Sequence, residues 1–250
     1  MSLESSIVDL TTRATALLDV FSNKAASINV AVAAAIAAVP ETSRTWYVDQ
    51  VNGLDTNAGT AAAPFKTINK AIANTPNFGV CTVQLLGDYN LAETITSTSS
   101  NLILVGSGAV RTLAPKYFQE VNASNVTSTF LGGFLLAIQA SSIEFRNLNI
   151  NLPSSAGQSP APTAIRQTGL VRTNGTGSVP ALLGVTFSAC AVSAAADFVG
   201  ALVGSTVSSV SLIGIGSTFP GSFGGKFVMG IASGTLPKDT SNVLTNFSAL

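Results

Sequence analysis

The stretch TWYVDQVNGLDTNAGTAAAPFKTINKAIAN, residues 45–74, decides the fold of this chain of 250 residues. Residues 45–48 favour a strand, and residues 49–59 gather the Asp, Asn and Gly residues that form tight turns. Pro64 suits the first turn of a helix. The stretch therefore predicts a strand, a loop and a short helix over residues 64–74.

The predicted helix is apolar on one face only. A helix of this length is not stable alone in water, so its apolar face has to cover other apolar groups. The open end of a stacked sheet is the most economical object for it to cover. The apolar face comprises Phe65, Ile68, Ala71 and Ile72, and the opposite face carries Lys66, Asn69 and Lys70.

This stretch resembles the opening segment of the pectate-lyase-like right-handed parallel β-helices, especially those of bacteriophage tailspikes and tail fibres. In that family the segment closes the N-terminal end of the β-helix with a strand, a loop and a capping helix. The resemblance implies a capping role for Phe65, Ile68 and Ile72, and it implies nothing about catalysis. It rests on Tyr47, Val48, Asp49, Asn52, Gly53, Asp55, Gly59 and Thr60, followed by APFKTINKAI.

Two carboxylates in the loop, Asp49 and Asp55, admit two interpretations. Asp side chains in a Gly-rich turn usually accept hydrogen bonds from nearby backbone groups. A calcium site is the alternative, because carboxylate oxygens are the ligands that Ca²⁺ prefers. We assign both residues to the turn and expect no metal site.

Residues 1–40 carry a heptad pattern, which is typical of a coiled coil. Apolar residues alternate in steps of four and three up to Phe21, where a second step of four introduces a stutter. No Gly or Pro interrupts residues 3–39, and Pro40 ends the helix. We predict a parallel coiled coil of three copies; an amphipathic helix lying on its own domain is the alternative. The predicted oligomerisation residues are Leu3, Ile7, Leu10, Leu17, Phe21, Ile28 and Val32.

Beyond residue 78, short apolar runs alternate with small polar residues, as expected for strands. Three runs share a shape, and aligning them places 37 residues between Leu148 and Val185 and 30 between Val185 and Ile215. We interpret them as coils of a parallel β-helix with loops of variable length; an all-β sandwich is the alternative. Residues 152–163 and 172–180 are rich in Pro, Gly and Ser and are predicted to be protruding loops, where binding would occur. The predicted strands lie in VCTVQLL (80–86), NLILVGS (101–107), FLLAIQAS (134–141), SIEFRNLNINL (142–152), PALLGVTFSACAV (180–192) and SSVSLIGIGSTF (208–219).

Composition narrows the classes of protein further. Hydrophobic residues make up 46% of the chain and charged residues 10%, against about 25% charged in ordinary soluble domains. This indicates apolar surface hidden between copies of the chain. The 12 basic and 12 acidic residues are scattered, which argues against nucleic-acid binding. No apolar run reaches the ~20 residues of a membrane span, and residues 1–10 do not resemble a secretory signal.

The chain offers little material for catalysis. It has no histidine, which excludes Ser-His-Asp and Cys-His systems and the usual zinc sites. GSFGGKF at 221–227 lacks the first glycine and the final Ser or Thr of a phosphate loop. Cys81 and Cys190 are predicted to be buried free thiols, with a disulfide or metal role as the alternative. We predict no catalytic residue and no cofactor.

Carboxylates are sparse in the predicted β-helix. Asp88 and Glu93 are the nearest pair, and both are predicted to be solvated at a turn into a strand. Glu144 and Arg146 alternate along one strand and are predicted to form an outward-facing ion pair. The acids beyond position 50 are Asp55, Asp88, Glu93, Glu120, Glu144, Asp197 and Asp239.

Three regions follow from these patterns: a coiled coil over residues 1–40, a linker and cap over 41–78, and a β-helix over 79–250. The resemblance implies a structural fibre or spike protein of a bacteriophage virion, assembled in the host cytoplasm. Its expected partners are two further copies of the chain, other tail, baseplate or capsid proteins, and a host surface glycan. A polysaccharide depolymerase and a decorative capsid fibre without a receptor role are the alternatives.

Overall fold

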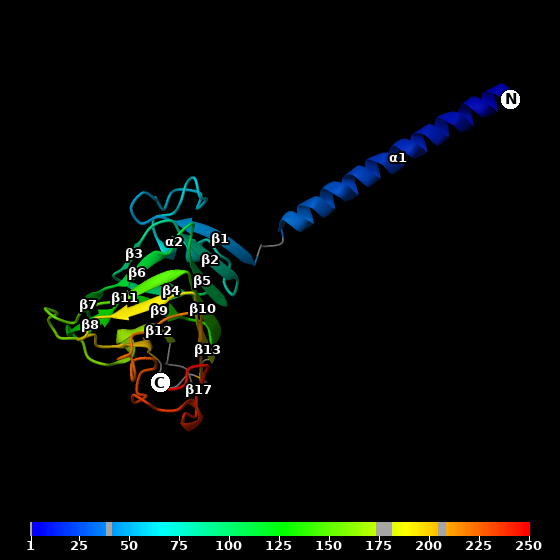
Figure 1. Cartoon of the computed structure of the whole chain (residues 1–250). Helices are drawn as coiled ribbons and strands as arrows, with labels where there is room; N and C mark the ends of the chain where they lie inside the picture. The colour runs from blue at the N-terminus through cyan, green and yellow to red at the C-terminus, as the bar shows by residue number, and fades with distance from the viewer. Residues whose placement is uncertain (1, 39–41, 174–181, 205–208) are drawn as a thin grey trace. The chain divides into compact units, whose positions relative to one another are not determined.

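A computed structural model describes residues 2–38, 42–173, 182–204 and 209–250. The chain divides into two units, Met1–Glu41 and Thr42–Leu250. The first contains one long helix, α1 (Leu3–Ala38), as the heptad pattern predicted. The second is mainly β, with parallel sheets and the short helix α2 (Ile68–Ala73) (Figure 1). Within the described residues, no helix is both long and apolar enough to cross a membrane.

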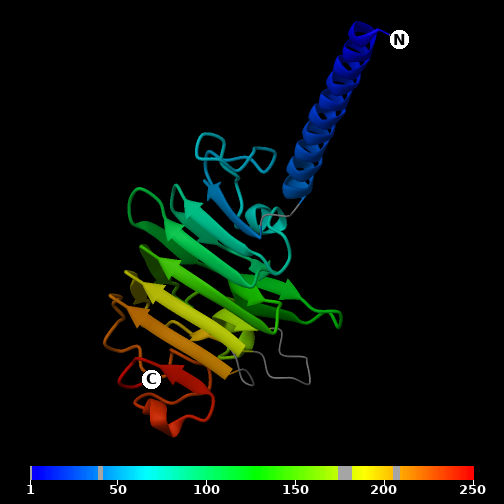
Figure 2. The ribbon, with the colours of Figure 1, turned by 90° about the vertical axis from the view of Figure 1, so that its right-hand side faces the viewer.

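The described part of the β unit contains three parallel sheets and one two-stranded antiparallel hairpin. Most strands that are consecutive along the chain belong to different parallel sheets. In the largest sheet, the strands lie side by side in the order in which they occur along the chain (Figure 2). That sheet contains β1 (Ser43–Val48), β2 (Val80–Leu85), β5 (Asn101–Gly106), β10 (Ala140–Arg146), β13 (Leu182–Ser188), β16 (Ser209–Ile215) and β17 (Val243–Thr245). The second sheet contains β3 (Tyr89–Leu91), β6 (Arg111–Pro115), β11 (Leu148–Leu152) and β14 (Ala191–Ala194), and the third β4 (Thr94–Ser97), β9 (Gly133–Leu136), β12 (Gly169–Thr173) and β15 (Ala201–Val203).

The chain passes through the three sheets in the same order several times, and we call one such passage a round. The first described rounds are β2-β3-β4, β5-β6-β9, β10-β11-β12 and β13-β14-β15. Residues that are hydrogen-bonded between neighbouring rounds lie 21, 41, 42, 27 and 32 positions apart. All strand pairs of the three sheets are parallel, so the antiparallel sandwich is excluded.

The alignment of Leu148 with Val185 and Ile215 is wrong. Val185 pairs with Ile143 and Leu212 in the largest sheet, whereas Leu148 lies in the second sheet opposite Arg111. The three runs share an alternating pattern, but Leu148 follows the turn that carries the chain into the next sheet. Likewise, the predicted run 134–141 is divided between β9 and β10. Apolar alternation alone therefore did not locate the turns.

The core is a set of columns in which equivalent residues of successive rounds stack. Phe145 stacks on Phe187 with ring centroids 5.1 Å apart and planes 12° apart. Both rings are fully buried, as are Ile143, Val185 and Leu212 in a neighbouring column. Burying each such side chain contributes about 1.5–3 kcal/mol relative to exposure. The core thus joins the rounds directly, one to the next.

Single residues with positive φ make the turns between the first and second sheets. Asn147, with φ 54°, follows β10, and Ala189, with φ 51°, follows β13. The Asn147 side chain donates to the Gly106 carbonyl oxygen of the preceding round at 3.1 Å. Left-handed geometry costs an L-residue about 1–2 kcal/mol, and asparagine tolerates it better than alanine. Ala189 therefore stores strain that Asn147 largely avoids.

We expect Ala189→Asn to raise the free energy of unfolding by about 1 kcal/mol, because asparagine fits left-handed geometry better than alanine. In a unit of this size that is about 2–4 °C in melting temperature, which thermal circular dichroism measures. Ala191→Asn is the matched control, since Ala191 is exposed within a strand and has no positive φ. An equal rise in the control, or none at position 189, would contradict the strain at Ala189.

Candidate functional site

The segment after β1 folds back beside that strand. The amide of Tyr47 donates to the Gly59 carbonyl, the amide of Phe65 donates to the Tyr47 carbonyl, and the amide of Asp49 donates to the Phe65 carbonyl, each at 2.9 Å. Phe65 is 2% exposed, and its ring centroid lies 5.3 Å from that of Trp46. Gly59 has φ 74°, and a Cβ there would clash with the Phe65 ring. The loop is therefore closed tightly over Phe65.

The prediction that Phe65 lies on the helix is wrong, because α2 begins only at Ile68. The Asp55 carboxylate accepts hydrogen bonds from the amides of Lys66 and Thr67 and from the Thr67 hydroxyl, at 2.9–3.0 Å. The Thr67 hydroxyl in turn accepts from the Lys70 amide and caps the helix. These bonds hold Thr67 in an extended conformation, so Phe65 instead forms an isolated bridge with Val48.

The predicted cap residues nevertheless lie in the same core. Ile68 is fully buried, Ile72 is 5% exposed, and both belong with Phe65 to one cluster of buried side chains. Helix α2 packs against β1, β2 and β4, the strands at the start of the three-sheet stack. The Trp46 indole donates to the Thr75 hydroxyl at 2.9 Å, just after the helix. The structure thus brings these three residues together, although on two different elements.

The two loop carboxylates act on the backbone. Asp49 accepts from the amides of Val51 and Asn52 and from the Asn52 side chain at 3.0–3.1 Å. The backbone hydrogen bond from Asn52 is the main cause that lowers the pKa of Asp49. Asp55 bonds to residues 11 and 12 positions away, so it joins the loop to the cap rather than shaping its own turn. Within the described residues, no three His, Cys, Asp or Glu side chains are grouped as a metal site.

The predicted oligomerisation residues are all exposed on α1 in the single chain. Their exposed fractions run from 51% at Val32 to 79% at Leu3. The helix is supported locally by an ion pair in which the Arg13 Nε lies 2.9 Å from Asp9. Self-association through this face stays a prediction. The seven residues are Leu3, Ile7, Leu10, Leu17, Phe21, Ile28 and Val32, and Val39 at the end of the predicted pattern lies outside the described residues.

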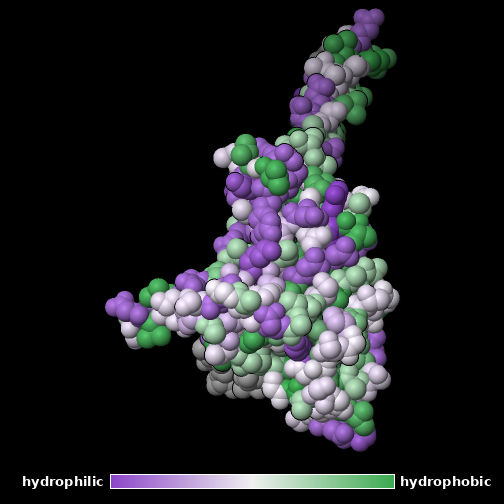
Figure 3. All heavy atoms as spheres, turned by 60° about the vertical axis from the view of Figure 1, so that its left-hand side comes forward, coloured by the Kyte–Doolittle hydropathy of each residue, from purple (hydrophilic) through white to green (hydrophobic). Residues whose placement is uncertain are grey.

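Three segments inserted between strands gather beside the third sheet, and we call them the insertions. They are the antiparallel hairpin of β7 (Tyr117–Val121) and β8 (Thr127–Leu131), residues 153–168, and residues 195–200. Figure 3 shows the hairpin projecting at the left of the view, with hydrophobic and hydrophilic residues together at its tip. The hairpin lies in the second round and residues 153–168 lie in the third, and these two rounds show the largest separations, 41 and 42 positions.

Hydrogen bonds join the insertions to one another. The Tyr117 hydroxyl donates to the Val199 carbonyl at 2.7 Å, and the Thr129 hydroxyl donates to the Pro160 carbonyl at 2.5 Å. Asp197 accepts from the hydroxyls of Ser154 and Ser155 and from a backbone amide. Burial is the main cause that raises the pKa of Tyr117 to about 12, so this hydroxyl stays neutral at ordinary pH. The insertions therefore form one connected surface.

A pocket of about 260 Å³ lies between the hairpin and the 3₁₀ helix η1 (Arg166–Thr168). Its floor is the outer face of the third sheet, where Leu135 of β9 is paired with Arg172 of β12. The hairpin contributes Phe130 and Glu120, and η1 contributes Arg166. The full lining is Thr94, Glu120, Phe130, Leu135, Arg166, Gln167 and Arg172.

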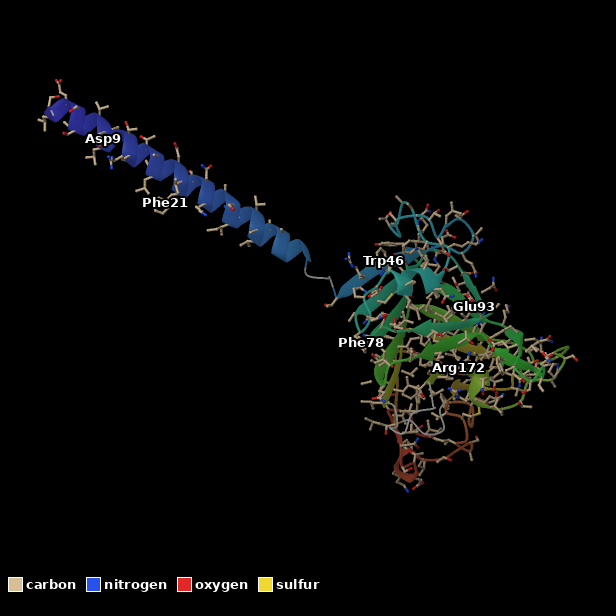
Figure 4. All side chains as sticks on the ribbon, turned by 180° about the vertical axis from the view of Figure 1, so that it is seen from behind. Asp9, Phe21, Trp46, Phe78, Glu93 and Arg172 are labelled. Carbon is tan, nitrogen blue, oxygen red and sulfur yellow. The ribbon has the colours of Figure 1, made fainter. Side chains whose placement is uncertain are left out.

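Arg172 is the buried charge of this pocket, with 4% of its surface exposed (Figure 4). Its guanidinium donates to the carbonyls of Leu131 and Gly169 at 3.2 and 3.3 Å, and also to the Gln167 carbonyl and the Thr94 hydroxyl. Burial is the main cause that lowers the pKa of Arg172 to about 10, and the positive charge of Arg166 lowers it further. Arg172 remains a cation at neutral pH.

Sequence reasoning missed this site. It assigned Arg172 to a loop over residues 172–180, whereas Arg172 and Thr173 belong to β12; residues 174–180 lie outside the described part of the chain. The available signal was the position of Arg172 directly after Gly169, Leu170 and Val171, a short run of strand length. The hairpin and η1 then bury the side chain, and neither contact is visible in the local sequence.

Other predicted polar features have simple structural roles. Arg146 and Glu144 form the predicted ion pair, with a 2.6 Å contact on the outer face of β10. Asp88 accepts from the Thr112 amide, and Glu93 accepts from the Asn69 side chain, so these two carboxylates serve different elements.

The two cysteines are buried free thiols, as predicted. Desolvation by burial is the main cause that raises the pKa of Cys81, to about 11. Burial likewise raises the pKa of Cys190. Both thiols therefore stay protonated and unreactive at neutral pH.

Comparison of the chain with protein-family models, with curated proteins and with solved structures finds no match.

Proposed function

We propose that this chain is a structural fibre or spike protein of a bacteriophage particle, which attaches the particle to a host surface or is itself anchored on the particle. The proposed architecture is a homotrimer with an N-terminal coiled coil followed by a right-handed parallel β-helix. One observation carries the proposal: the chain returns to three parallel sheets in a constant order, and the segment of residues 45–74 lies at the first strands of that stack. This is the arrangement that the resemblance implies.

The heptad face of α1 supports the trimer. Its apolar residues are exposed along the described helix, and a single copy would leave them in water at a cost of about 25 cal/mol per Å². A heptad spacing favours supercoiling with other helices over packing on a globular surface. The low share of charged residues, 10%, agrees with further surface hidden between copies.

The insertions support an attachment role. They are joined to one another by hydrogen bonds, and two of them, the hairpin and the segment 153–168, line a pocket on the third sheet. Rigid scaffolds commonly carry their binding residues on such segments. We place the ligand-binding surface here rather than at the cap, where Asp49 and Asp55 are engaged by the backbone.

Glu120 favours a second candidate function, cleavage of a polysaccharide, because it places a carboxylate in the pocket beside two arginines. Most glycosidases, however, use two carboxylates on either side of the scissile bond. Among the described residues lining the pocket, Glu120 is the one carboxylate. Attachment is therefore the better-supported function, and release of reducing ends from a bound polysaccharide would reverse this preference.

Native mass spectrometry of the full chain tests the proposed assembly, and a trimer is the expected result. Deleting residues 1–39 should give a monomer or a weakly associated species that keeps its β-sheet circular dichroism, because the β unit has its own core. A stable monomer of the full chain would refute the trimer. Loss of the β signal on deletion would refute the division into an association helix and an independent β unit.

A further inference from the structure

We propose that the pocket between the hairpin and η1 binds an oxyanion, either a carboxylate or a phosphate, that is carried on a sugar ring. The ligand enters with its anionic group directed towards Arg166 and Arg172 and its ring against Phe130 and Leu135. This inference rests on the proposed function, since it names the chemical class of ligand that the surface of the insertions would take.

Positive charge predominates among the described residues that line the pocket. Arg166 and Arg172 line the same pocket, and the one carboxylate in the described lining, Glu120, is an exposed residue of the hairpin. Burial and the charge of Arg166 lower the pKa of Arg172 more than the charge of Glu120 raises it, and in the described part of the chain no Asp or Glu oxygen lies within ion-pair distance of either guanidinium. Residues 174–181, which follow β12, include no acidic residue. A buried cation without a carboxylate partner is costly, and a bound anion would offset that cost.

The two arginines differ in how many of their hydrogen-bond donors are already used. An arginine has five N–H donors in one plane, a geometry that matches carboxylate and phosphate oxygens. Four acceptors hold Arg172 in place. Arg166, by contrast, donates through Nη1 to the Thr173 carbonyl at 2.5 Å, and this is its one hydrogen bond to the described residues. Arg172 thus supplies a fixed positive field, and Arg166 retains donors for a ligand.

The walls of the pocket are partly apolar and partly polar. Phe130 forms an edge-to-face pair with Phe118, its partner across the hairpin, whose ring centroid lies 6.1 Å away, so its position is supported by this neighbour. Leu135 gives the floor an apolar patch beside the arginines. Glu120, Gln167 and Thr94 add oxygen and nitrogen atoms suited to hydroxyl groups. At about 260 Å³, the pocket is slightly smaller than the usual ~300–1,000 Å³ of small-molecule sites, so it fits one terminal sugar of a longer chain.

A purely structural role is the competing explanation for Arg172, because its bonds join β4, the end of β8, η1 and the start of β12. A substitution of Arg172 would therefore affect both the stability of the fold and ligand binding, and the two effects could not be separated. Arg166 and Glu120 are the better positions for substitution. Loss of a structural contact would lower stability at either position, but it would not raise ligand affinity in one variant and reduce it in the other.

Isothermal titration calorimetry of the full chain tests the site with four probes: glucuronic acid, glucose 6-phosphate, glucose and inorganic phosphate. We expect the two anionic sugars to bind, glucose to show no detectable binding, and phosphate alone to bind more weakly than glucose 6-phosphate. Tighter binding of glucuronic acid would identify a carboxylate ligand, and tighter binding of glucose 6-phosphate a phosphate ligand. Affinity should fall as salt rises, because the attraction is screened.

Arg166→Gln should weaken binding of the better anionic sugar at least tenfold, and Glu120→Gln should strengthen it severalfold by removing a like charge. Lys116→Gln is the matched control, since Lys116 is exposed next to the hairpin and does not line the pocket. The control should bind within twofold of the unchanged chain. Thermal circular dichroism confirms that each variant is folded.

Three results would overturn the inference: equal binding of glucose and the anionic sugars, equal loss of affinity in the Arg166 and Lys116 variants, or no binding of any anionic probe. Native mass spectrometry of the same samples distinguishes failure of the proposed anion site from failure of the proposed function. A trimer that binds no anion refutes the pocket alone. A stable monomer that still binds through Arg166 refutes the trimeric fibre alone.

Discussion

Phe65→Ala should lower the free energy of unfolding of the β unit by about 3–5 kcal/mol, the usual effect of removing a buried aromatic ring. Phe65 is 2% exposed, packs against Trp46 and lies under Gly59, so the cavity has little chance to collapse. Its loss also loosens the loop that covers β1, the first strand of the largest sheet. An uncovered strand edge is a template for pairing with another chain, so we expect aggregation as well.

Urea unfolding followed by circular dichroism measures the change, with light scattering for aggregation. Asp55→Asn is the control and should cost only about 1 kcal/mol, because the amide oxygen still accepts a backbone hydrogen bond at an exposed site. Comparable decreases in the free energy of unfolding of the two variants would mean that the hydrogen bonds of Asp55, rather than the apolar contacts of Phe65, stabilise the cap. A harmless Phe65→Ala would refute the capping role.

Leu17→Asp combined with Phe21→Asp should convert the proposed trimer into a monomer. Three copies would bring six carboxylates into an apolar seam, where each unpaired buried charge costs several kcal/mol. Sedimentation velocity of the full chain measures the change in mass, and the β-sheet circular dichroism should be unaltered.

The matched control is Ser5→Asp combined with Thr12→Asp, which adds the same charge on the face of the helix opposite the predicted seam. It should leave the mass unchanged. If both double variants dissociate to the same extent, net charge rather than the seam controls association. If neither dissociates, the contacts between copies lie outside α1.

Local chemistry explains which parts of the fold the sequence predicted. The strand, turn and helix of residues 45–74 are specified by neighbouring residues, and α1 by an uninterrupted heptad pattern. Phe65 was placed on the wrong element because the groups that delay the helix, above all Asp55, act across a loop of 12 positions. Without that contact, Pro64 is a reasonable helix start.

The pocket was unpredictable for a related reason. Arg172 precedes a Gly-rich segment and has the local signature of a loop, yet its surroundings come from the hairpin, η1 and β4, up to 78 positions away. The pairing of the strands was mispredicted for the same reason: Leu148 and Val185 have similar neighbours in the sequence but lie in different sheets. Sequence periodicity identifies strands, whereas the length of each insertion decides which residues meet.

The unequal rounds have a consequence for biosynthesis. Each strand of the largest sheet from β5 to β16 pairs with the strand of the preceding round, so its partner has already left the ribosome when it emerges. Translation at about 5–20 residues per second delivers a round of 42 positions in roughly 2–8 s, whereas local pairing of strands takes microseconds. The delay before the next strand of the largest sheet can pair is therefore longest while the second and third rounds are being translated. During that interval the nascent chain is most exposed to pairing with the wrong strand.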